Sequence, residues 1–214
     1  MNTWIKSKQA VNMKLTVKTK VFILKLLIHL GALLPVIQLY YLALADNLGA
    51  DPVKAVIHFT GIGAFNLLLV TLALSPLAKT FKLGFLMQLR RLLGLYVFAY
   101  ALLHVLNFIV FELQFDFSLL LSEIIKRPYI TIGFVALVLL FALAITSFDA
   151  IKRKMGRSWQ SLHNFIYLLV LLVGIHFYWS VKSEVIEPGI YLAVTLILLY
   201  WRRDKIKRWL KFKS

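Results

Sequence analysis

The sequence predicts an all-α integral membrane protein, a bundle of six transmembrane helices with both termini on the cytoplasmic side. The composition excludes a soluble domain, because 61% of the 214 residues are hydrophobic, the mean hydropathy is +0.82 and only 16% are charged. The apolar residues fall in runs long enough to cross about 30 Å of hydrocarbon as helices. Cysteine is absent, which excludes disulfides and thiolate-bound metal clusters.

Three spans are expected in the first half of the chain. The first covers residues 21–45 and follows a basic cytoplasmic tail, residues 1–20. Its apolar run is longer than the ~7 to 15 residues of a cleaved signal peptide, so we expect a retained helix. The second covers residues 53–78, where Pro52 suits a first helical turn. The third covers residues 92–113.

Three further spans are expected in the second half. The fourth begins at a proline after an acidic loop and covers residues 128–148, and the fifth covers residues 161–181. The sixth runs from Pro188 to Arg202. Residues 21–203 are therefore predicted to form one transmembrane domain, and residues 204–214 a second basic cytoplasmic tail.

The distribution of charge predicts the orientation. Twenty of the 25 Lys and Arg residues fall in the N-terminal tail, in residues 202–214 and in the connections 79–91 and 152–157, whereas seven of the nine acids fall on the opposite side. Loops that stay in the cytoplasm carry an excess of Lys and Arg, so both termini are predicted to be cytoplasmic. The net charge of +16 follows from this bias and from attraction to anionic lipid, which explains it better than nucleic-acid binding.

Two histidines are predicted to face each other from different spans. His104 lies eight residues before Glu112, and His176 six before Lys182, so both lie about 9 to 12 Å from the outer ends of their helices. An ionisable residue inside a span costs ~2 to 3 kcal/mol or more unless something compensates it. For neutral imidazoles without acidic ligands, that partner is haem iron. Without cysteine for covalent attachment, the haem must be b-type, held between the helices.

A third histidine lies near the inner end of the fifth span. His163 precedes His176 by about 20 Å along an ideal helix and by about 140° around it, so a kink is needed for both to face the interior. This spacing suits two stacked cofactors better than one, yet Arg90 and Arg91, not a histidine, lie at its depth on the third span. One haem or two thus remains open.

Other polar and small residues in the spans have simpler explanations. For His29 and His58, a hydrogen-bonded or interfacial imidazole explains the residue at least as well as a ligand does. Gly61 and Gly133 are interpreted as positions of close helix contact.

These residues resemble the ferric-reductase-like transmembrane superfamily, and within it the haem-binding membrane subunits of bacterial protein-methionine-sulfoxide reductase systems. The resemblance covers nearly the whole chain. It rests on LGADPVK at 48–54, HFTG at 58–61, RRLLGL at 90–95, the LLH of His104, RPYITIG at 127–133, LHNFIYL around His163 and HFYWSVK around His176.

The resemblance implies a non-catalytic electron conduit in the bacterial inner membrane. Such proteins bind haem b and FMN, and accept electrons from the quinone pool or a cytoplasmic flavin reductase. They pass these electrons to a periplasmic molybdopterin enzyme that reduces methionine sulfoxide in proteins. The resemblance places the haem ligands at His104, His163 and His176, while Arg90 and Arg91 are candidates to hold a flavin phosphate or a haem propionate, although many such charges are simply solvated. The superfamily's oxidases carry two histidines on the third span, where this chain has one.

Three alternatives to this conduit remain: a free-standing reductase, a proton-coupled transporter and a passive anchor subunit. The sequence has no G-x-G-x-x-G turn for NAD(P)H, so we expect a membrane-soluble donor or a partner to deliver the electrons. This counts against a free-standing ferric or oxygen reductase, the main alternative. A proton-coupled transporter normally adds intramembrane carboxylates, whereas Lys25 is the only ionisable residue besides histidine away from the very ends of the predicted spans. A passive anchor subunit would not need the level histidine pair.

Overall fold

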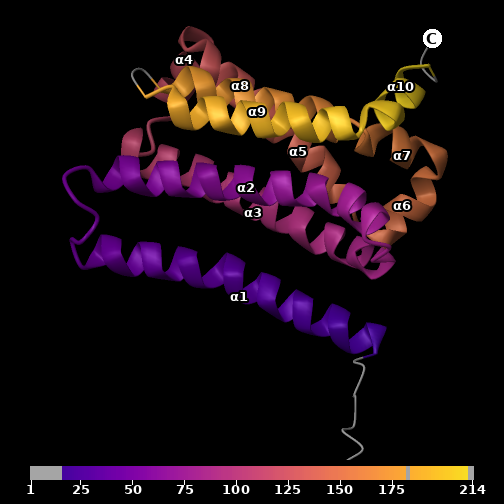
Figure 1. Ribbon diagram of the computed structural model, residues 1–214. Coiled ribbons are helices and arrows are strands. Elements are labelled where there is room, and N and C mark those ends of the chain that lie inside the picture. The colour runs from indigo at the N-terminus through magenta and orange to yellow at the C-terminus, as the bar shows by residue number, and fades with distance from the viewer. Residues whose placement is uncertain (1–15, 182–183, 212–214) are drawn as a thin grey trace, which may run out of the picture.

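The computed structural model describes residues 16–181 and 184–211, which form helices joined by short loops. The long helices run side by side in three layers (Figure 1). A single helix forms the first layer, two form the second, and three form the third. These are α1 (Val17–Leu44); α2 (Pro52–Thr80) with α3 (Arg90–Asn107); and α5 (Pro128–Ile145), α8 (Ile166–Ser180) and α9 (Ile186–Trp201).

Short helices mark the two ends of the bundle (Figure 1). At one end, hereafter the α4 end, α4 (Phe117–Lys126) lies beyond α8. At the opposite end, hereafter the α10 end, the bundle is closed by α6 (Asp149–Met155), α7 (Arg157–His163) and α10 (Arg203–Lys211).

Five helices are long and apolar enough to cross a membrane, which confirms five of the six predicted spans in the described residues. The third of these, Gly84–Glu112, consists of the 3-10 turn η1 (Gly84–Leu89), then α3, then the π-helical turn η2 (Phe108–Glu112). The sixth predicted span, α9, is also an apolar helix, but its 16 residues make it shorter than the other five. At 1.5 Å per residue it is about 24 Å long.

Segments predicted to lie between or after the spans also contain helix, and the predicted loop 152–157 begins with the last turn of α6. The sequence analysis interpreted residues 114–127 as an acidic loop, yet α4 forms there, because the Asp116 carboxylate accepts hydrogen bonds from the backbone N–H groups of Ser118 and Leu119 at 2.9 and 3.2 Å. The predicted C-terminal tail contains α10. Most of the predicted N-terminal tail, residues 1–15, lies outside the described residues, as does Lys182, and α1 already begins at Val17.

The fifth span is broken where the histidine spacing required a change of direction. Helix α7 ends at His163, Asn164 and Phe165 form a turn, and α8 begins at Ile166. The Phe165 N–H bonds to the carbonyl of Leu162 at 3.0 Å, three residues back, which tightens the turn. His163 and His176 therefore lie on separate helices.

The core lies between the second and third layers. Phe65, Leu68 and Leu72 of α2 are fully buried, and Leu169 and Val170 of α8 pack in the same cluster. Helix α1 is much less covered and leaves most of its apolar side chains exposed, which suits a helix that faces lipid. This arrangement places α3 and α8 on either side of a shared interior.

Candidate functional site

His104 lies near the end of α3 and is held against α2. Its Nδ1 lies 2.9 Å from the carbonyl oxygen of Ile57. One helical turn further along α2, Gly61 leaves room for the ring, because a Cβ there would lie 3.0 Å from both Cε1 and Nδ1 of His104. The glycine and the carbonyl together fix the plane and the direction of the imidazole.

His176 on α8 is held against α5 in the same way. Its Nδ1 lies 2.7 Å from the carbonyl oxygen of Tyr129. Gly133, one turn further along α5, leaves room for this ring as well, and a Cβ there would lie 2.7 Å from Cε1 and Nδ1 of His176. This contact is tighter than the one at Gly61.

The two histidine sites repeat one another in sequence. Each histidine follows its carbonyl partner by 47 residues, and each glycine stands four residues after that carbonyl. The pairs α2–α3 and α5–α8 thus present the same device from opposite sides of the interior. The sequence analysis missed this repeat and assigned Gly61 and Gly133 to helix packing, although the equal spacing could have been found in the sequence.

The two imidazoles face each other across the interior. Their ring centroids are 6.2 Å apart and their planes are inclined at 84°. A carbonyl oxygen only accepts hydrogen bonds, so each Nδ1 carries the proton and each Nε2 keeps a free lone pair for a metal. A bond from imidazole nitrogen to metal is about 2 Å long, so one metal ion between the two Nε2 atoms would put the centroids roughly 6 Å apart.

This pair suits a metal that brings its remaining ligands with it. Among the described residues, no group of three or more His, Asp or Glu side chains could hold an ion. Two opposed imidazoles supply the two axial ligands of a haem iron, whose macrocycle supplies the other four. The residues present therefore fit a haem better than they fit a bare ion.

A polar network supports the His104 side of the pair. Asn107, one turn beyond His104, is buried, and its Oδ1 accepts a hydrogen bond from the hydroxyl of Tyr40 on α1 at 2.7 Å. Its Nδ2 donates to the hydroxyl of Thr60 on α2 at 3.4 Å. Asn107 thereby links three helices beside His104, a role that the sequence analysis did not anticipate.

His163 is not brought to either of these histidines. It lines a cavity near the α10 end, stacks on the Trp159 indole with centroids 4.0 Å apart, and its Nε2 lies 3.0 Å from the hydroxyl oxygen of Thr146. That hydroxyl donates to the carbonyl of Ala142 at 2.7 Å, so it accepts from the imidazole Nε2. In contrast to His104 and His176, His163 has its Nε2 engaged.

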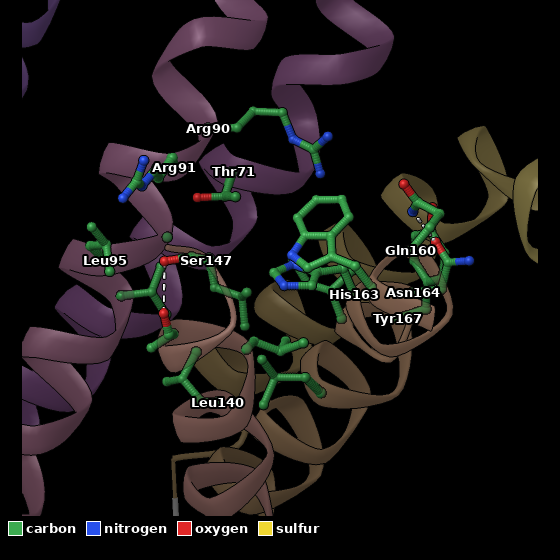
Figure 2. A pocket seen from close by; sticks show the side chains of 18 of the residues that line it. Thr71, Arg90, Arg91, Leu95, Leu140, Ser147, Gln160, His163, Asn164 and Tyr167 are labelled. Carbon is green, nitrogen blue, oxygen red and sulfur yellow. Dashed lines mark hydrogen bonds between the residues drawn. The ribbon is translucent and has the colours of Figure 1, made fainter. Parts of the chain in front are cut away.

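The cavity beside His163, hereafter the inner cavity, has a volume of about 330 Å³. Figure 2 shows His163, Gln160 and Asn164 on one side of it and Arg90 and Arg91 on the other. The two predicted arginines differ in their surroundings. Arg91 pairs with Asp149 at 2.8 Å, whereas the buried Nε of Arg90 has no hydrogen-bond partner.

The remaining two histidines lie away from the inner cavity. His58, near the α4 end, is exposed and lies 6.1 Å from the ring of Phe177 between centroids. His29, on α1, is exposed and its Nδ1 lies 2.6 Å from the hydroxyl of Tyr96 on α3. The hydrogen-bonded interpretation of His29 is confirmed.

Comparison with known proteins identifies a family and relatives that match nearly the full chain. Residues 60–174 match the family described as "Ferric reductase like transmembrane component". The chain is 46% identical over 198 residues to proteins from Cronobacter sakazakii, Enterobacter sp. and Klebsiella pneumoniae, each named "Protein-methionine-sulfoxide reductase heme-binding subunit MsrQ". These matches cover 92% of this chain and 98%, 99% and 98% of the three relatives.

The family match spans more than half of the chain, including Gly61, His104, Gly133 and His163, and ends two residues before His176. The full-length relatives extend the similarity over nearly all of the rest. The chain therefore belongs to the MsrQ family, within the ferric reductase-like transmembrane proteins.

Proposed function

We propose that this chain is a haem b electron-transfer subunit of a protein-methionine-sulfoxide reductase system, as the names of its relatives suggest. The observation that carries the proposal is the facing pair of His104 and His176, each with Nδ1 fixed to a carbonyl and Nε2 left for iron. A bound haem supplies an iron that accepts and releases one electron at a time.

The chain's own residues explain why this site transfers electrons without transforming a substrate. His104 and His176 would both hold a bound haem iron, and the iron would then have no free site for a substrate. Gly61 and Gly133 hold both imidazoles in place, and this limits rearrangement when the charge on the iron changes.

Orientation decides where the electrons go. We place the α10 end in the cytoplasm, because the described parts of the basic connections 79–91 and 152–157 and of the basic segment 202–211 lie there, and we take α9 as a sixth crossing between α8 and α10. His104 and His176 then lie nearer the periplasmic side. The acceptor is accordingly a periplasmic methionine-sulfoxide reductase, which the family resemblance makes a molybdopterin enzyme.

The inner cavity extends the electron path toward the cytoplasm. His163 lies on its wall, and the arginines opposite suit an anionic group, so we propose an inner cofactor here, a second haem or FMN. For His163 to bind iron through Nε2, it would have to release Thr146. A flavin would leave that hydrogen bond intact.

The donor that the structure supports best is a membrane quinol. His29 and Tyr96 form a hydrogen-bonded pair of side chains on the exposed side of α1 and α3, where a lipid-soluble molecule has access. Imidazole and phenol can accept and donate protons at the two oxygens of a quinol, as its oxidation requires. Tyr96 is the neighbour of Leu95 on α3, and Leu95 lines the inner cavity, so the quinol site would be separated from the inner cofactor only by α3. A cytoplasmic flavin reductase is the other donor that the resemblance implies.

His29→Ala and Tyr96→Phe should each slow haem reduction by quinol by roughly fivefold, the effect of losing one hydrogen bond. The measurement is stopped-flow absorbance of the protein in liposomes after addition of decylubiquinol or a menaquinol analogue. Tyr41→Phe is the matched control, since Tyr41 is an exposed tyrosine of α1, the helix that carries His29. Haem content should not change, and unaltered rates in both variants would exclude a donor site here.

The proposed function itself is tested by reoxidation. Protein reduced with dithionite and freed of excess reductant should lose its reduced b-type absorbance when it is mixed anaerobically with a relative's methionine-sulfoxide reductase subunit. When the haem protein is in excess over the reductase, added methionine sulfoxide should allow all of the haem to be reoxidised. If the reductase has no effect but ferric citrate or oxygen reoxidises the haem rapidly, the chain is a free-standing reductase.

A further inference from the structure

Arg202 is a buried cation that the sequence analysis treated only as the end of the sixth span. It follows α9 directly and is only 5% exposed. One terminal nitrogen, Nη2, donates to the carbonyl of Leu72 on α2, and Nη1 lies 3.5 Å from the hydroxyl of Tyr167. The remaining nitrogen, Nε, is buried without a hydrogen-bond partner. Part of this guanidinium therefore lacks the partner that its burial requires.

Arg90 resembles Arg202 in its position and in its unpaired nitrogen. Arg90 and Arg202 line the same inner cavity, and the buried Nε of Arg90 also lacks a hydrogen-bond partner. The two ion pairs found among the described residues are Arg91–Asp149 and Arg127–Glu123, and neither involves these two arginines. A guanidinium stays protonated at any ordinary pH, so burial cannot neutralise the two charges. An external anion is the group that would.

The positive charge continues from this cavity to the surface. A second, more open cavity at the α10 end is lined by Lys79 and Arg208, and it shares Arg202 and Lys205 with the inner cavity. Burial, followed by the charges of Arg202 and Arg90, lowers the pKa of Lys205 below its ordinary value. Basic residues therefore line both the inner cavity beside His163 and the more open cavity at the α10 end.

We propose that Arg90 and Arg202 together bind the anionic group of the inner cofactor, a phosphate monoester or a carboxylate, whose flat apolar body lies in the inner cavity. The planar donors of a guanidinium match both anions in a bidentate manner, and two guanidiniums can share one group. Leu68, Leu140 and Leu143 supply apolar walls for the body. The volume falls within the range of small-molecule sites, about 300 to 1,000 Å³.

The assignment deepens the proposed function, on which it rests, and changes the expected partner of Arg90. The sequence paired Arg90 with its neighbour Arg91, but Arg91 is already neutralised by Asp149. The residue that shares the task with Arg90 comes from the other end of the chain. Two sources provide the anion, a flavin phosphate and a haem propionate, and they are separated by experiment.

The first measurement compares flavins that differ only in the phosphate. FMN should bind the purified protein at least tenfold more tightly than riboflavin. Binding of each flavin is measured by the quenching of its fluorescence. Arg202→Gln and Arg90→Gln should reduce this preference to within about twofold and leave the riboflavin affinity unchanged. Arg202→Lys, which keeps the charge without the planar donors, should be intermediate. Arg153→Gln is the control, an exposed arginine of α6 that lines neither cavity.

The second measurement tests whether the anion is a haem propionate. The number of haems per protein is determined as the pyridine haemochrome. A fall from two haems to one in Arg202→Gln, with His104 and His176 intact, would assign the site to a propionate. Phosphorus from co-purified lipid is measured as well, because a lipid headgroup is another anion that could reach the arginines. If the preference for FMN, the haem content and the lipid phosphorus are all unchanged in Arg202→Gln, the proposal is wrong and Arg202 only tethers α9 to Leu72. If only the lipid phosphorus falls, the arginines bind lipid and the proposal is also wrong.

These outcomes are independent of the proposed function. The haem proposed between His104 and His176 is hereafter the outer haem. In every variant its spectrum reports both the folding of the protein and the state of this site. A protein that binds no haem at all refutes the electron-transfer function. A protein that keeps the outer haem and is reoxidised by the reductase, but shows no effect of Arg90→Gln or Arg202→Gln, refutes only the anion site.

Discussion

His104→Ala and His176→Ala are each expected to remove the outer b-type haem, with haem retention at least about tenfold below that of the unaltered protein. The reason is that the two ring centroids lie 6.2 Å apart and each Nδ1 is bonded to a backbone carbonyl, which leaves each Nε2 for iron. Removing either imidazole would leave a bound haem with only one of the two histidines proposed to hold it. The measurement is the reduced-minus-oxidised spectrum of detergent-purified protein, with haem quantified as the pyridine haemochrome.

The other histidines serve as controls for this experiment. His58→Ala should keep the outer haem, because the His58 side chain is exposed and contacts Phe177. His163→Ala should spare the outer haem and lower total haem only if the inner cofactor is a haem. A full outer-haem spectrum in either His104→Ala or His176→Ala would contradict the proposed site, and with it the electron path.

The histidine pair was predictable from the sequence because depth in a membrane follows from counting residues along a helix. His104 and His176 lie at similar distances from the charged ends of their spans, and this alone placed them level. The direction of each ring does not follow from such counting. It depends on Ile57 and Tyr129, backbone groups whose side chains carry no signal for this role.

The inner site was less accessible to sequence reasoning, for a different physical reason. Arg202 stands at the end of an apolar run, where a solvated, positive-inside charge is the ordinary expectation. Only the fold brings the end of α9 against Leu72 of α2, 130 residues away in the chain. The same ambiguity hid the difference between Arg90 and Arg91, because the carboxylate that neutralises Arg91 belongs to Asp149 of a later helix.

The α4 segment shows a limit of reasoning from polarity. Its flanking acids suggested a loop, but an acidic residue before an apolar stretch is also a helix N-cap, and Asp116 has that role. Hydrogen bonds from Ser118 and Leu119 lower the pKa of this exposed carboxyl, with the Ser118 side chain as the largest cause. The sequence therefore contained the signal for α4, and the composition of the surrounding loop obscured it.

Gly133→Ala is expected to weaken haem binding by about tenfold, the lower end of the effect of losing a group that orients a metal ligand. A Cβ at this position would lie 2.7 Å from Cε1 and Nδ1 of His176, too close for the ring to stay where it is. The imidazole must then give up the Tyr129 carbonyl or turn its Nε2 away from the iron. Gly61→Ala should have a smaller effect, a few-fold at most, because the corresponding distance to His104 is 3.0 Å and a slight shift relieves it.

The matched control for these two variants is Gly31→Ala, a helical glycine of α1 with nothing within 4 Å of the added methyl group. It should bind haem like the unaltered protein, since alanine favours a helix over glycine by about 0.5 to 1 kcal/mol. Haem titration of the apoprotein, with circular dichroism to verify helix content, would rank the three variants. Equal affinities for all three would mean that the glycines only permit helix packing, as the sequence alone suggested. The predicted order, with Gly133→Ala weakest, then Gly61→Ala, then Gly31→Ala, would instead show that the repeated carbonyl and glycine position the two axial ligands.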